Sequence, residues 1–305
     1  MGVARALVGP TASGKSEAAV PLAADLGAEI VSVDSMLVYR GMDVGTAKPS
    51  LSERARVPHH LIDVAEPSER FTVARYQQLG RRARAAVEGG GHRVLFVGGS
   101  GLYYRAAVDE LEFPPEDRGT RALLEAEADI AGAASLHRRL SDLDPVGAAR
   151  IDPDNVRRTV RALEVAAVTG TPFSTFAEPW NTFDPDRVRV AGVRLSRDVL
   201  AERVRRRVRD MLDAGWLEEV RGLVERGFGG WLTSTQAIGY AELAAHLDGR
   251  LALEDAVQRT EVRTRHLARR QMSWFVRDPR VRWFDAGPAG AVELLGDLRS
   301  YLESA

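Results

Sequence analysis

The chain has 305 residues, of which 45% are hydrophobic and 28% are charged, and its formal net charge is −1. This composition is typical of a globular protein, and the length suits one large domain or a core with a smaller module. The absence of cysteine excludes disulfides and thiolate metal sites. No apolar run is long enough to span a membrane, and the N-terminus leads directly into a predicted strand. We therefore expect a cytoplasmic protein that does not bind a membrane. We also expect a monomer.

A glycine-bounded loop lies between an apolar run at residues 4–8 and a helical pattern that continues through residue 23. Its residues are Gly9, Pro10, Thr11, Ala12, Ser13, Gly14, Lys15 and Ser16. In this context, successive backbone N–H groups and the helix N-terminus bind phosphate. Lys15 adds a positive charge for the terminal phosphate oxygens, and the Ser16 hydroxyl suits a Mg²⁺ ligand. The pattern predicts a diphosphate or nucleotide site with Mg²⁺ as cofactor, and the alternative is a glycine-rich turn without a ligand.

Lysine is almost absent from the chain. Of the 42 lysines and arginines, only Lys15 and Lys48 are lysines. Because a compact ammonium and a planar guanidinium bind differently, the retained Lys15 indicates a position that requires an ammonium. For Lys48, in the segment 45–49, a similar requirement and chance survival both stay open.

Residues 28–33 are predicted to form a second buried strand, which ends at Asp34. In open α/β sheets, ligands bind in the crevice at the carboxyl ends of parallel strands. We therefore expect Asp34 to face the same crevice as the phosphate loop, and the alternative is that it caps the next turn. Farther on, Ser50 and Glu53 form a capping box that predicts a short helix, and Thr72 is expected to cap another.

A third buried strand is predicted at residues 94–97, and it runs into the glycine-rich segment 98–101. Enzymes that hydrolyse nucleotides usually end this strand in an acidic residue that helps to hold Mg²⁺. Its absence argues against a motor or switch ATPase. It leaves open an enzyme that holds a di- or triphosphate while another group attacks.

The segment 111–179 is predicted to be a helical insertion, and residues 188–195 return to the sheet. The remainder is predicted to be helical, with segments at 198–214, 217–226, around 241 and at 254–276. The expected fold class is α/β, with a P-loop-type parallel sheet core and flanking helices (1–110 and 180–305) plus a mainly α-helical insertion domain (111–179).

Two segments are rich in arginine although the net charge is close to zero. Residues 194–209 hold seven arginines. Residues 259–282 hold eight arginines, with Trp274 and Phe275 among them and Trp283 and Phe284 directly after them. Local basic faces of this kind can neutralise nucleic-acid phosphates. Solvated helix faces in an arginine-rich chain are the alternative.

In order along the chain, these motifs resemble the tRNA dimethylallyltransferases, the isopentenyl-transferase family that prenylates adenine. The resemblance covers nearly the whole length. It is carried by the segments 9–16, 34–43, 45–49, 98–103, 157–164, 237–240 and 269–275. A phosphate loop alone is shared by many enzymes, whereas this ordered set is specific.

The resemblance implies transfer of the dimethylallyl group from dimethylallyl diphosphate to N6 of the adenosine that follows the anticodon in tRNA. Diphosphate leaves, and Mg²⁺ assists. Asp34 would accept the proton of the attacking amine, a role that typically contributes about 10²–10⁴-fold to the rate. Thr11 and Arg207 would donate to the bridging oxygen as the C–O bond breaks.

The resemblance also implies contacts with the tRNA anticodon loop, whose target base must leave its stack to reach the reacting carbon. The implied residues are Asp34, Ser35, Met36 and Leu37; Arg157, Arg158, Thr159, Val160 and Arg161; Gln236, Ala237, Ile238, Gly239 and Tyr240; and Arg269, Arg270, Gln271 and Trp274. The chain departs from the family pattern at Leu37, where Gln is usual, and at Ala241 and Val276, where Lys or Arg is usual. These changes remove polar groups on the tRNA side and leave Asp34 and the phosphate loop intact.

Two other functions stay open on the sequence. A P-loop small-molecule kinase would share the phosphate loop, the Mg²⁺ site and the carboxylate, and would require ATP. A nucleotide-sensing RNA-binding protein would bind without covalent chemistry. The insertion and the basic-aromatic segments favour the prenyltransferase over the kinase, and the position of Asp34 favours it over the binding protein.

Overall fold

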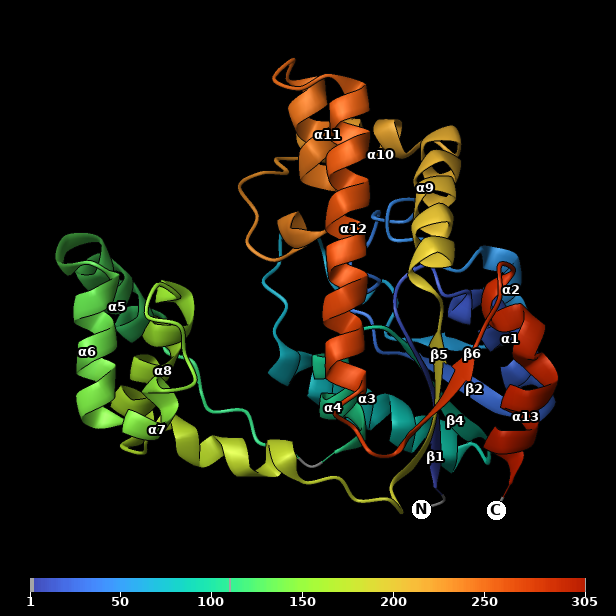
Figure 1. The fold of residues 1–305 in the computed structure, drawn as a ribbon, viewed down its shortest axis with the longest axis horizontal. Helices are drawn as coiled ribbons and strands as arrows, with labels where there is room; N and C mark the ends of the chain where they lie inside the picture. The colour runs from blue at the N-terminus through green and yellow to red at the C-terminus, as the bar shows by residue number, and fades with distance from the viewer. Residues whose placement is uncertain (1–2, 110, 305) are drawn as a thin grey trace. The chain divides into compact units, whose positions relative to one another are not determined.

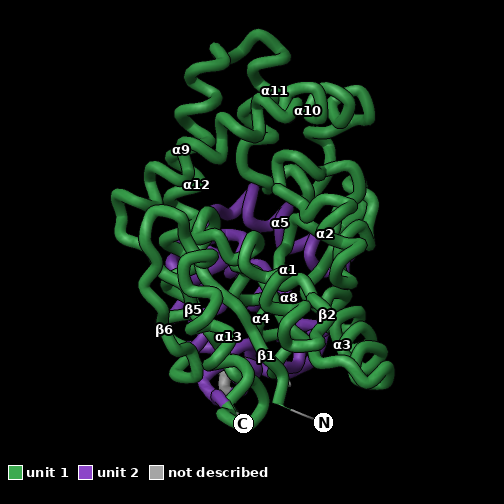
Figure 2. The backbone as a smooth tube through the Cα atoms, turned by 90° about the vertical axis from the view of Figure 1, so that its right-hand side faces the viewer, with its two compact units in different colours: residues 1–109, 184–305 green, residues 110–183 purple. Residues whose placement is uncertain are grey.

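The computed structural model describes residues 3–109 and 111–304. The chain divides into two compact units, one formed by residues 1–109 with 184–305 and the other by residues 110–183 (Figure 2). The second unit is thus inserted in the chain between a helix and a strand of the first unit. Among the described residues, no helix has the length and apolar composition needed to cross a membrane.

The first unit is built on a six-stranded, all-parallel sheet with the strand order β3-β2-β4-β1-β5-β6. The strands are β1 (Ala4–Val8), β2 (Ala28–Ser32), β3 (His59–His60), β4 (Arg93–Gly98), β5 (Val188–Arg194) and β6 (Val281–Asp285). The central strands are buried on both faces, which explains their continuous apolar runs. The predicted P-loop-type α/β fold is confirmed.

Helices cover both faces of this sheet (Figure 1). Helix α1 (Lys15–Leu26), the 3₁₀ turn η3 (Gly290–Leu294) and α13 (Leu295–Glu303) pack on one face, and α3 (Val73–Gly89) and α4 (Gly101–Val108) pack on the other. Side chains such as Leu7, Leu22 and Leu95 form the core beneath α1. The predicted capping box is present at α2 (Leu51–Arg56), and Thr72 caps α3 as expected.

The strands β3 and β6 were not predicted, and the expectation that everything after residue 195 is helical is wrong at β6. This strand has only five residues, and its pairing with β5 decides its conformation. The second arginine-rich segment ends in this strand. Arg280, just before it, is buried and pairs with Asp109 (2.8 Å) and Asp278 (2.7 Å), so it is committed within the protein.

Beyond the carboxyl ends of the strands stand further helices of the first unit (Figure 1). They are α9 (Arg197–Asp213), α10 (Trp216–Glu225), the 3₁₀ turn η2 (Ser234–Gln236), α11 (Tyr240–Leu247) and α12 (Leu253–Phe275). Helices α9 and α12 pack on each other, and α12 also contacts α4. These helices lie over the edge of the sheet at which the phosphate loop and Asp34 are found.

The second unit is helical, as expected. It contains α5 (Arg118–Ala131), α6 (Ala133–Leu143), α7 (Pro145–Ala148), α8 (Val156–Thr169) and the 3₁₀ segment η1 (Phe173–Asn181). Its core includes Leu124, Leu136 and Leu163. The carboxylate of Glu164 is fully buried and accepts hydrogen bonds from Arg121 and Arg161, which compensates the burial of its charge.

Candidate functional site

The phosphate loop between β1 and α1 depends on two glycines. Gly14, at the N-terminus of α1, has φ +82°, a left-handed conformation that side chains disfavour. A Cβ at Gly9 would lie 2.6 Å from the carbonyl oxygen of Val193 on β5. Neither position therefore accommodates a side chain without a shift of the backbone, and the loop stays close to the sheet.

Lys15 is buried in this loop, and its Nζ donates to the carbonyl of Pro10 (3.0 Å). Burial and, to a lesser extent, the charge of Arg207 lower the pKa of Lys15 to about 8, although the charge of Asp34 acts in the opposite direction. An ammonium with a depressed pKa next to a second cation is a group that a bound polyanion would stabilise.

A bound diphosphate would raise the pKa of Lys15. We therefore expect diphosphate binding at about pH 8.5 to be accompanied by proton uptake. The affinity for pyrophosphate should therefore fall as the pH rises through about 8, where free Lys15 loses its proton. Titration calorimetry in two buffers with different ionisation heats measures the uptake. The matched control is Lys15→Arg, whose side chain stays charged; the same uptake in this variant would remove Lys15 as the responsible group.

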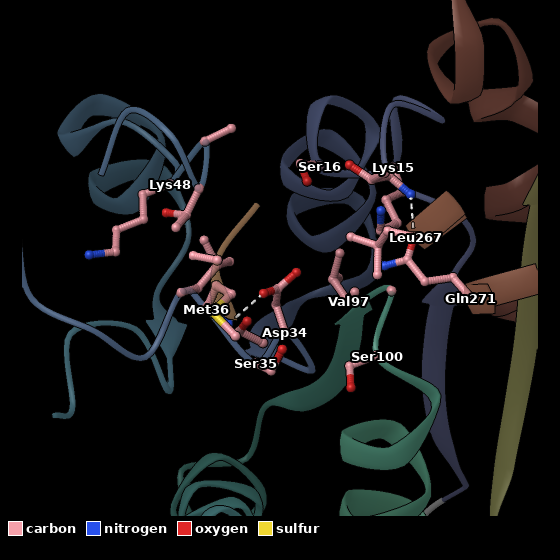
Figure 3. Close-up of a pocket in the computed structure, with 18 of the residues that line it drawn as sticks. Lys15, Ser16, Asp34, Ser35, Met36, Lys48, Val97, Ser100, Leu267 and Gln271 are labelled. Atoms are coloured by element: carbon pink, nitrogen blue, oxygen red, sulfur yellow. Dashed lines mark hydrogen bonds between the residues drawn. The ribbon is translucent and has the colours of Figure 1, made fainter. Parts of the chain in front are cut away.

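Asp34 lies just beyond β2, as predicted. Its Oδ1 accepts a hydrogen bond from the backbone N–H of Met36 (2.8 Å), so one oxygen does cap the following turn. In Figure 3 the other carboxylate oxygen points away from Met36, toward the phosphate loop. Among the described residues, none hydrogen-bonds this second oxygen. The capping role and a role in the cavity are therefore compatible.

Residues 203–207 of α9 include four arginines, and contacts and burial distinguish three of them. Arg203 is buried and donates to the carbonyls of Ala12 (2.7 Å) and Pro288 (2.9 Å), so it supports the phosphate loop. Arg205 is exposed and pairs with Glu202 (2.5 Å). Burial lowers the pKa of Arg207, whereas the charge of Asp34 raises it. Arg207 is the arginine of this group that lines the cavity shared with Asp34.

That cavity has a volume of about 450 Å³ and lies between the carboxyl edge of the sheet, α9 and α12 (Figure 3). It brings together Thr11, Lys15, Ser16, Asp34, Ser35, Met36, Leu37, Arg207, Ala237, Ile238, Arg270, Gln271 and Trp274 from the predicted site. A second cavity of about 650 Å³ adjoins it and shares Lys15, Ser16 and Arg207. Polar groups at the phosphate loop thus face a pocket whose other walls combine apolar side chains, such as Leu102, Ile238 and Leu267, with polar ones, such as Thr264 and Arg270.

Sequence reasoning missed part of the cavity wall on α12. Thr260, Thr264 and Leu267 line it together with Gln271 and Trp274. Spacings of three and four residues place these side chains on one face of the helix. This periodicity was the available indication, but the sequence does not say which face of α12 turns toward the phosphate loop.

Several residues predicted to contact tRNA do not line the cavity. Gln236 and Arg269 are exposed. Gly239 lies against the indole of Trp216, from which a Cβ would be only 2.0 Å away. Tyr240 is fully buried, and its hydroxyl donates to Oε1 of Glu219 (2.7 Å). The side chain of Tyr240 therefore supports the fold in this conformation.

The predicted segment 157–161 lies in the second unit, at the start of α8. Arg157 and Arg158 are exposed, whereas Thr159 and Val160 are buried in the core of that unit. Arg161 donates to the carbonyls of Pro114 (2.7 Å) and Pro115 (3.0 Å). An RNA contact by side chains of this segment thus depends on Arg157 and Arg158.

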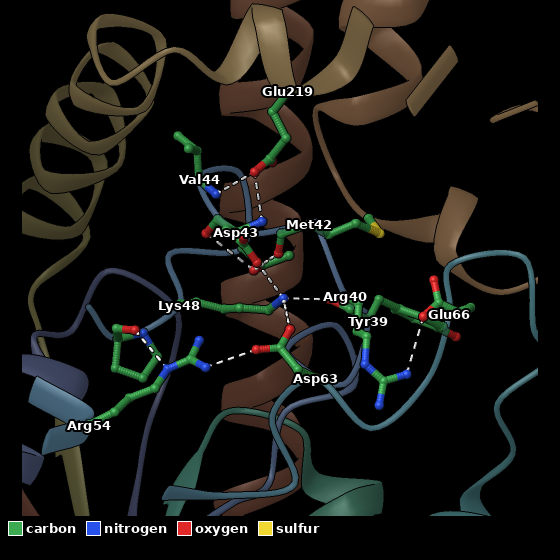
Figure 4. A network of polar contacts seen from close by, with 12 residues as sticks. Tyr39, Arg40, Met42, Asp43, Val44, Lys48, Arg54, Asp63, Glu66 and Glu219 are labelled. Carbon is green, nitrogen blue, oxygen red and sulfur yellow. Dashed lines mark hydrogen bonds and ion pairs between the residues drawn. The ribbon is translucent and has the colours of Figure 1, made fainter. Parts of the chain in front are cut away.

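Lys48 holds the loop that follows Asp34 (Figure 4). Its side chain is 2% exposed, and its Nζ donates to Asp43 (2.5 Å), to Asp63 (2.6 Å) and to the carbonyl of Tyr39. Glu219 of α10 supports the same loop, since its carboxylate accepts the N–H groups of Asp43 and Val44 (both 2.7 Å). Three converging acceptors suit an ammonium, so the structure favours a requirement for lysine over chance.

Lys48→Met is expected to lower the free energy of unfolding by about 2–3 kcal/mol, because it removes charged hydrogen bonds from a buried site. Urea unfolding at neutral pH measures the change. Lys48→Arg serves as the control and should restore only part of the stability, since its planar fork cannot meet all three acceptors. A loss below about 0.5 kcal/mol in the Met variant would contradict this account.

Two family models match the sequence. The model described as IPP transferase matches residues 37–278, and the model described as Isopentenyl transferase matches residues 2–63. Together they include the phosphate loop, Asp34 and α12.

The chain is also similar to curated and solved proteins over nearly its whole length. It is 45% identical to the tRNA dimethylallyltransferase of Desulforudis audaxviator over 96% of each chain, and 47% identical to that of Streptomyces coelicolor over 95% of this chain and 92% of the relative. The crystal structure of the tRNA isopentenylpyrophosphate transferase from Bacillus halodurans is 39% identical (TM-score 0.70) and covers 99% of this chain and 95% of its own. A eukaryotic dimethylallyltransferase captured acting on tRNA is 26% identical (TM-score 0.82) and covers 96% of this chain and 75% of its own.

Proposed function

The chain belongs to the IPP transferase family, and we propose that it transfers a dimethylallyl group from dimethylallyl diphosphate to N6 of the adenosine that follows the anticodon in tRNA. The product is N6-(dimethylallyl)adenosine in tRNA, and the second product is diphosphate. The chain is thus a prenyltransferase that modifies tRNA.

One observation carries the assignment of the reaction to this site. The phosphate loop, Arg207 and the free oxygen of Asp34 meet at a cavity of about 450 Å³ whose remaining walls include Leu102, Ile238 and Leu267. The cations suit the diphosphate, and the apolar walls suit a five-carbon hydrocarbon. A carboxylate at their junction suits a base for the incoming amine.

In the proposed mechanism, the adenine N6 attacks the first carbon of the dimethylallyl group while the bond from this carbon to the diphosphate oxygen breaks. Asp34 accepts the amine proton through the oxygen that does not bind Met36. The developing charge on the bridging oxygen is stabilised by Thr11 and Arg207, and Lys15 binds the terminal phosphate. Each of these roles is supported by the position of the side chain in the cavity.

The donor set near the phosphate loop fits Mg²⁺. Among the described residues there is no cluster of three or more His, Cys, Asp or Glu that could hold a metal alone. The exposed hydroxyl of Ser16 offers one hard oxygen ligand, and Mg²⁺ commonly completes its shell with water and substrate phosphates. We propose that Ser16 holds the ion, which when bound offsets the negative charge of the diphosphate.

A kinase and a nucleotide-sensing binding protein are not favoured, because the relatives over nearly the full length are named as tRNA dimethylallyltransferases.

We propose that the enzyme acts as a monomer in the cytoplasm, where its tRNA substrate is found. The described residues of one chain supply the phosphate loop, Asp34 and Arg207 to the cavity, which supports a monomer because no partner subunit is needed to provide them.

The direct test is mass spectrometry of unmodified tRNA incubated with the protein, Mg²⁺ and dimethylallyl diphosphate. A parallel reaction contains ATP instead. The expected result is a mass gain of one five-carbon unit in the first reaction only, located on the adenosine 3′ of the anticodon. No gain in the first reaction, together with ATP consumption when small metabolites are added, would overturn the proposal in favour of a kinase.

Charge reversal on α12 is expected to weaken tRNA binding in a salt-dependent manner. Arg269 is the suitable position because it is exposed, whereas Arg263 is paired with Glu242. In Arg269→Glu, the slope of log affinity against log salt should decrease by about 1, since one phosphate contact is lost. Arg299→Glu, on the exposed side of α13, is the control. An unchanged slope for Arg269→Glu would place the RNA elsewhere.

A further inference from the structure

Gln271 joins helix α12 to the phosphate loop. It is 8% exposed, and its Oε1 accepts the backbone N–H of Thr11 at 2.8 Å (Figure 3). The two residues are 260 positions apart in the sequence. A buried amide that binds the backbone of the loop has a defined partner in the protein, which distinguishes it from the exposed arginines Arg269 and Arg270 before it.

The glycine-rich turn after β4 provides the space for this side chain. A Cβ at Gly99 would lie 2.3 Å from Nε2 and 3.0 Å from Cδ of Gln271. Two residues after Gly99, a Cβ at Gly101 would lie 2.5 Å from Cβ of Trp274, which follows Gln271 by one turn of α12. These glycines therefore let α12 approach the end of β4. The close approach explains why small residues stand after β4, where hydrolytic NTPases have an acidic residue.

The phosphate loop needs such support because its backbone is strained. Ala12 has φ +63°, a left-handed conformation that costs a residue with a side chain about 1–2 kcal/mol. The two groups that bracket this residue are both held from distant helices. Gln271 of α12 binds the N–H of Thr11, and Arg203 of α9 binds the carbonyl of Ala12 (2.7 Å).

We propose that Gln271 is a positioning residue that holds the phosphate loop in its diphosphate-binding conformation and couples it to α12. It acts through the backbone N–H of Thr11, which it holds in place. The inference rests on the proposed function, and it assigns Gln271 to the diphosphate side of the site, whereas the family resemblance places it among the tRNA contacts. Helix α12 also bears Arg270 and Trp274 on the cavity wall, so the hydrogen bond joins this wall to the phosphate loop.

The first experiment compares Gln271→Met with Gln258→Met, the same substitution at an exposed position of the same helix. Loss of one buried hydrogen bond should raise the dissociation constant for inorganic pyrophosphate about 5–10-fold in Gln271→Met. The KM for dimethylallyl diphosphate should rise with it, while the dissociation constant for tRNA and the values of Gln258→Met stay unchanged. A weaker tRNA affinity with normal pyrophosphate affinity would overturn the inference and assign Gln271 to the RNA.

A double-mutant cycle separates positioning from general damage to the fold. Gly99→Ala should weaken pyrophosphate binding in the parent chain, because its Cβ would displace the Gln271 amide at 2.3 Å, whereas its 3.1 Å contact with the carbonyl oxygen of Gly9 needs only a small adjustment. In a Gln271→Ala background the same change should have a clearly smaller effect, since the displaced group is gone. Fully additive effects would overturn the inference. If the parent chain itself binds no pyrophosphate, the proposed function fails. If the parent chain and Gln271→Met both bind pyrophosphate normally, only the inference about Gln271 fails.

Discussion

Asp34→Asn is expected to lower kcat for tRNA prenylation about 10²–10⁴-fold, the range that a positioned general base contributes. The amide retains the shape of the side chain, and its Oδ1 can still accept the N–H of Met36, so the turn should be preserved. It cannot take the proton of the attacking amine. Single-turnover measurements with preformed complex, in which the mass gain of the tRNA is followed over time, isolate this step.

Binding measurements control for this interpretation. Asp34→Asn should bind pyrophosphate at least as tightly as the parent chain, because the carboxylate that it removes lies near the same cations as the bound anion. The affinity for tRNA should change little. Turnover within a few-fold of the parent would rule out Asp34 as the base and leave it with the structural role of capping the turn.

Arg207→Gln is expected to lower kcat about 10²–10³-fold, the typical cost of removing one preplaced donor from a developing oxyanion. Its guanidinium lines the cavity, and among the described residues no partner hydrogen-bonds it, so it is available to the leaving group. The KM for dimethylallyl diphosphate should increase less than kcat decreases, because the charge on the bridging oxygen develops mainly as the bond breaks.

Arg205→Gln is the matched control for this variant, since Arg205 lies on the same helix, is exposed and pairs with Glu202. Its kinetics should stay within about twofold of the parent, as expected for an exposed ion pair. A large loss in Arg205→Gln with normal activity in Arg207→Gln would show that the assignment along α9 is shifted by two residues.

The two predictions separate chemistry from binding. Asp34 acts on the nucleophile and Arg207 on the leaving group, and both face one cavity with Lys15. A protein that only binds RNA and nucleotide would lose affinity in such variants without a change in RNA mass. Loss of turnover with retained binding in both variants would therefore support the prenyl transfer directly.

The sequence by itself determined the features that depend on consecutive residues. The strand, loop and helix at residues 4–26 and the capping residues Ser50 and Thr72 are local, because each arises from hydrogen bonds and torsion angles within a few positions. The position of Asp34 at the sheet edge followed from the rule that ligands bind at the carboxyl ends of parallel strands. The ordered motifs identified the family, and the comparisons confirm it.

Only the tertiary structure decided which side chains meet across long sequence separations. In it, Arg207 lines the cavity whereas Arg203 supports the phosphate loop. One face of α12 lies toward the phosphate loop, and the short strand β6 pairs with β5. The tertiary structure also gave Lys48 three acceptors. The physical reason is common to all of them: the orientation of a helix and the conformation of a short strand are fixed by packing against distant elements, and local sequence patterns carry no information about those partners.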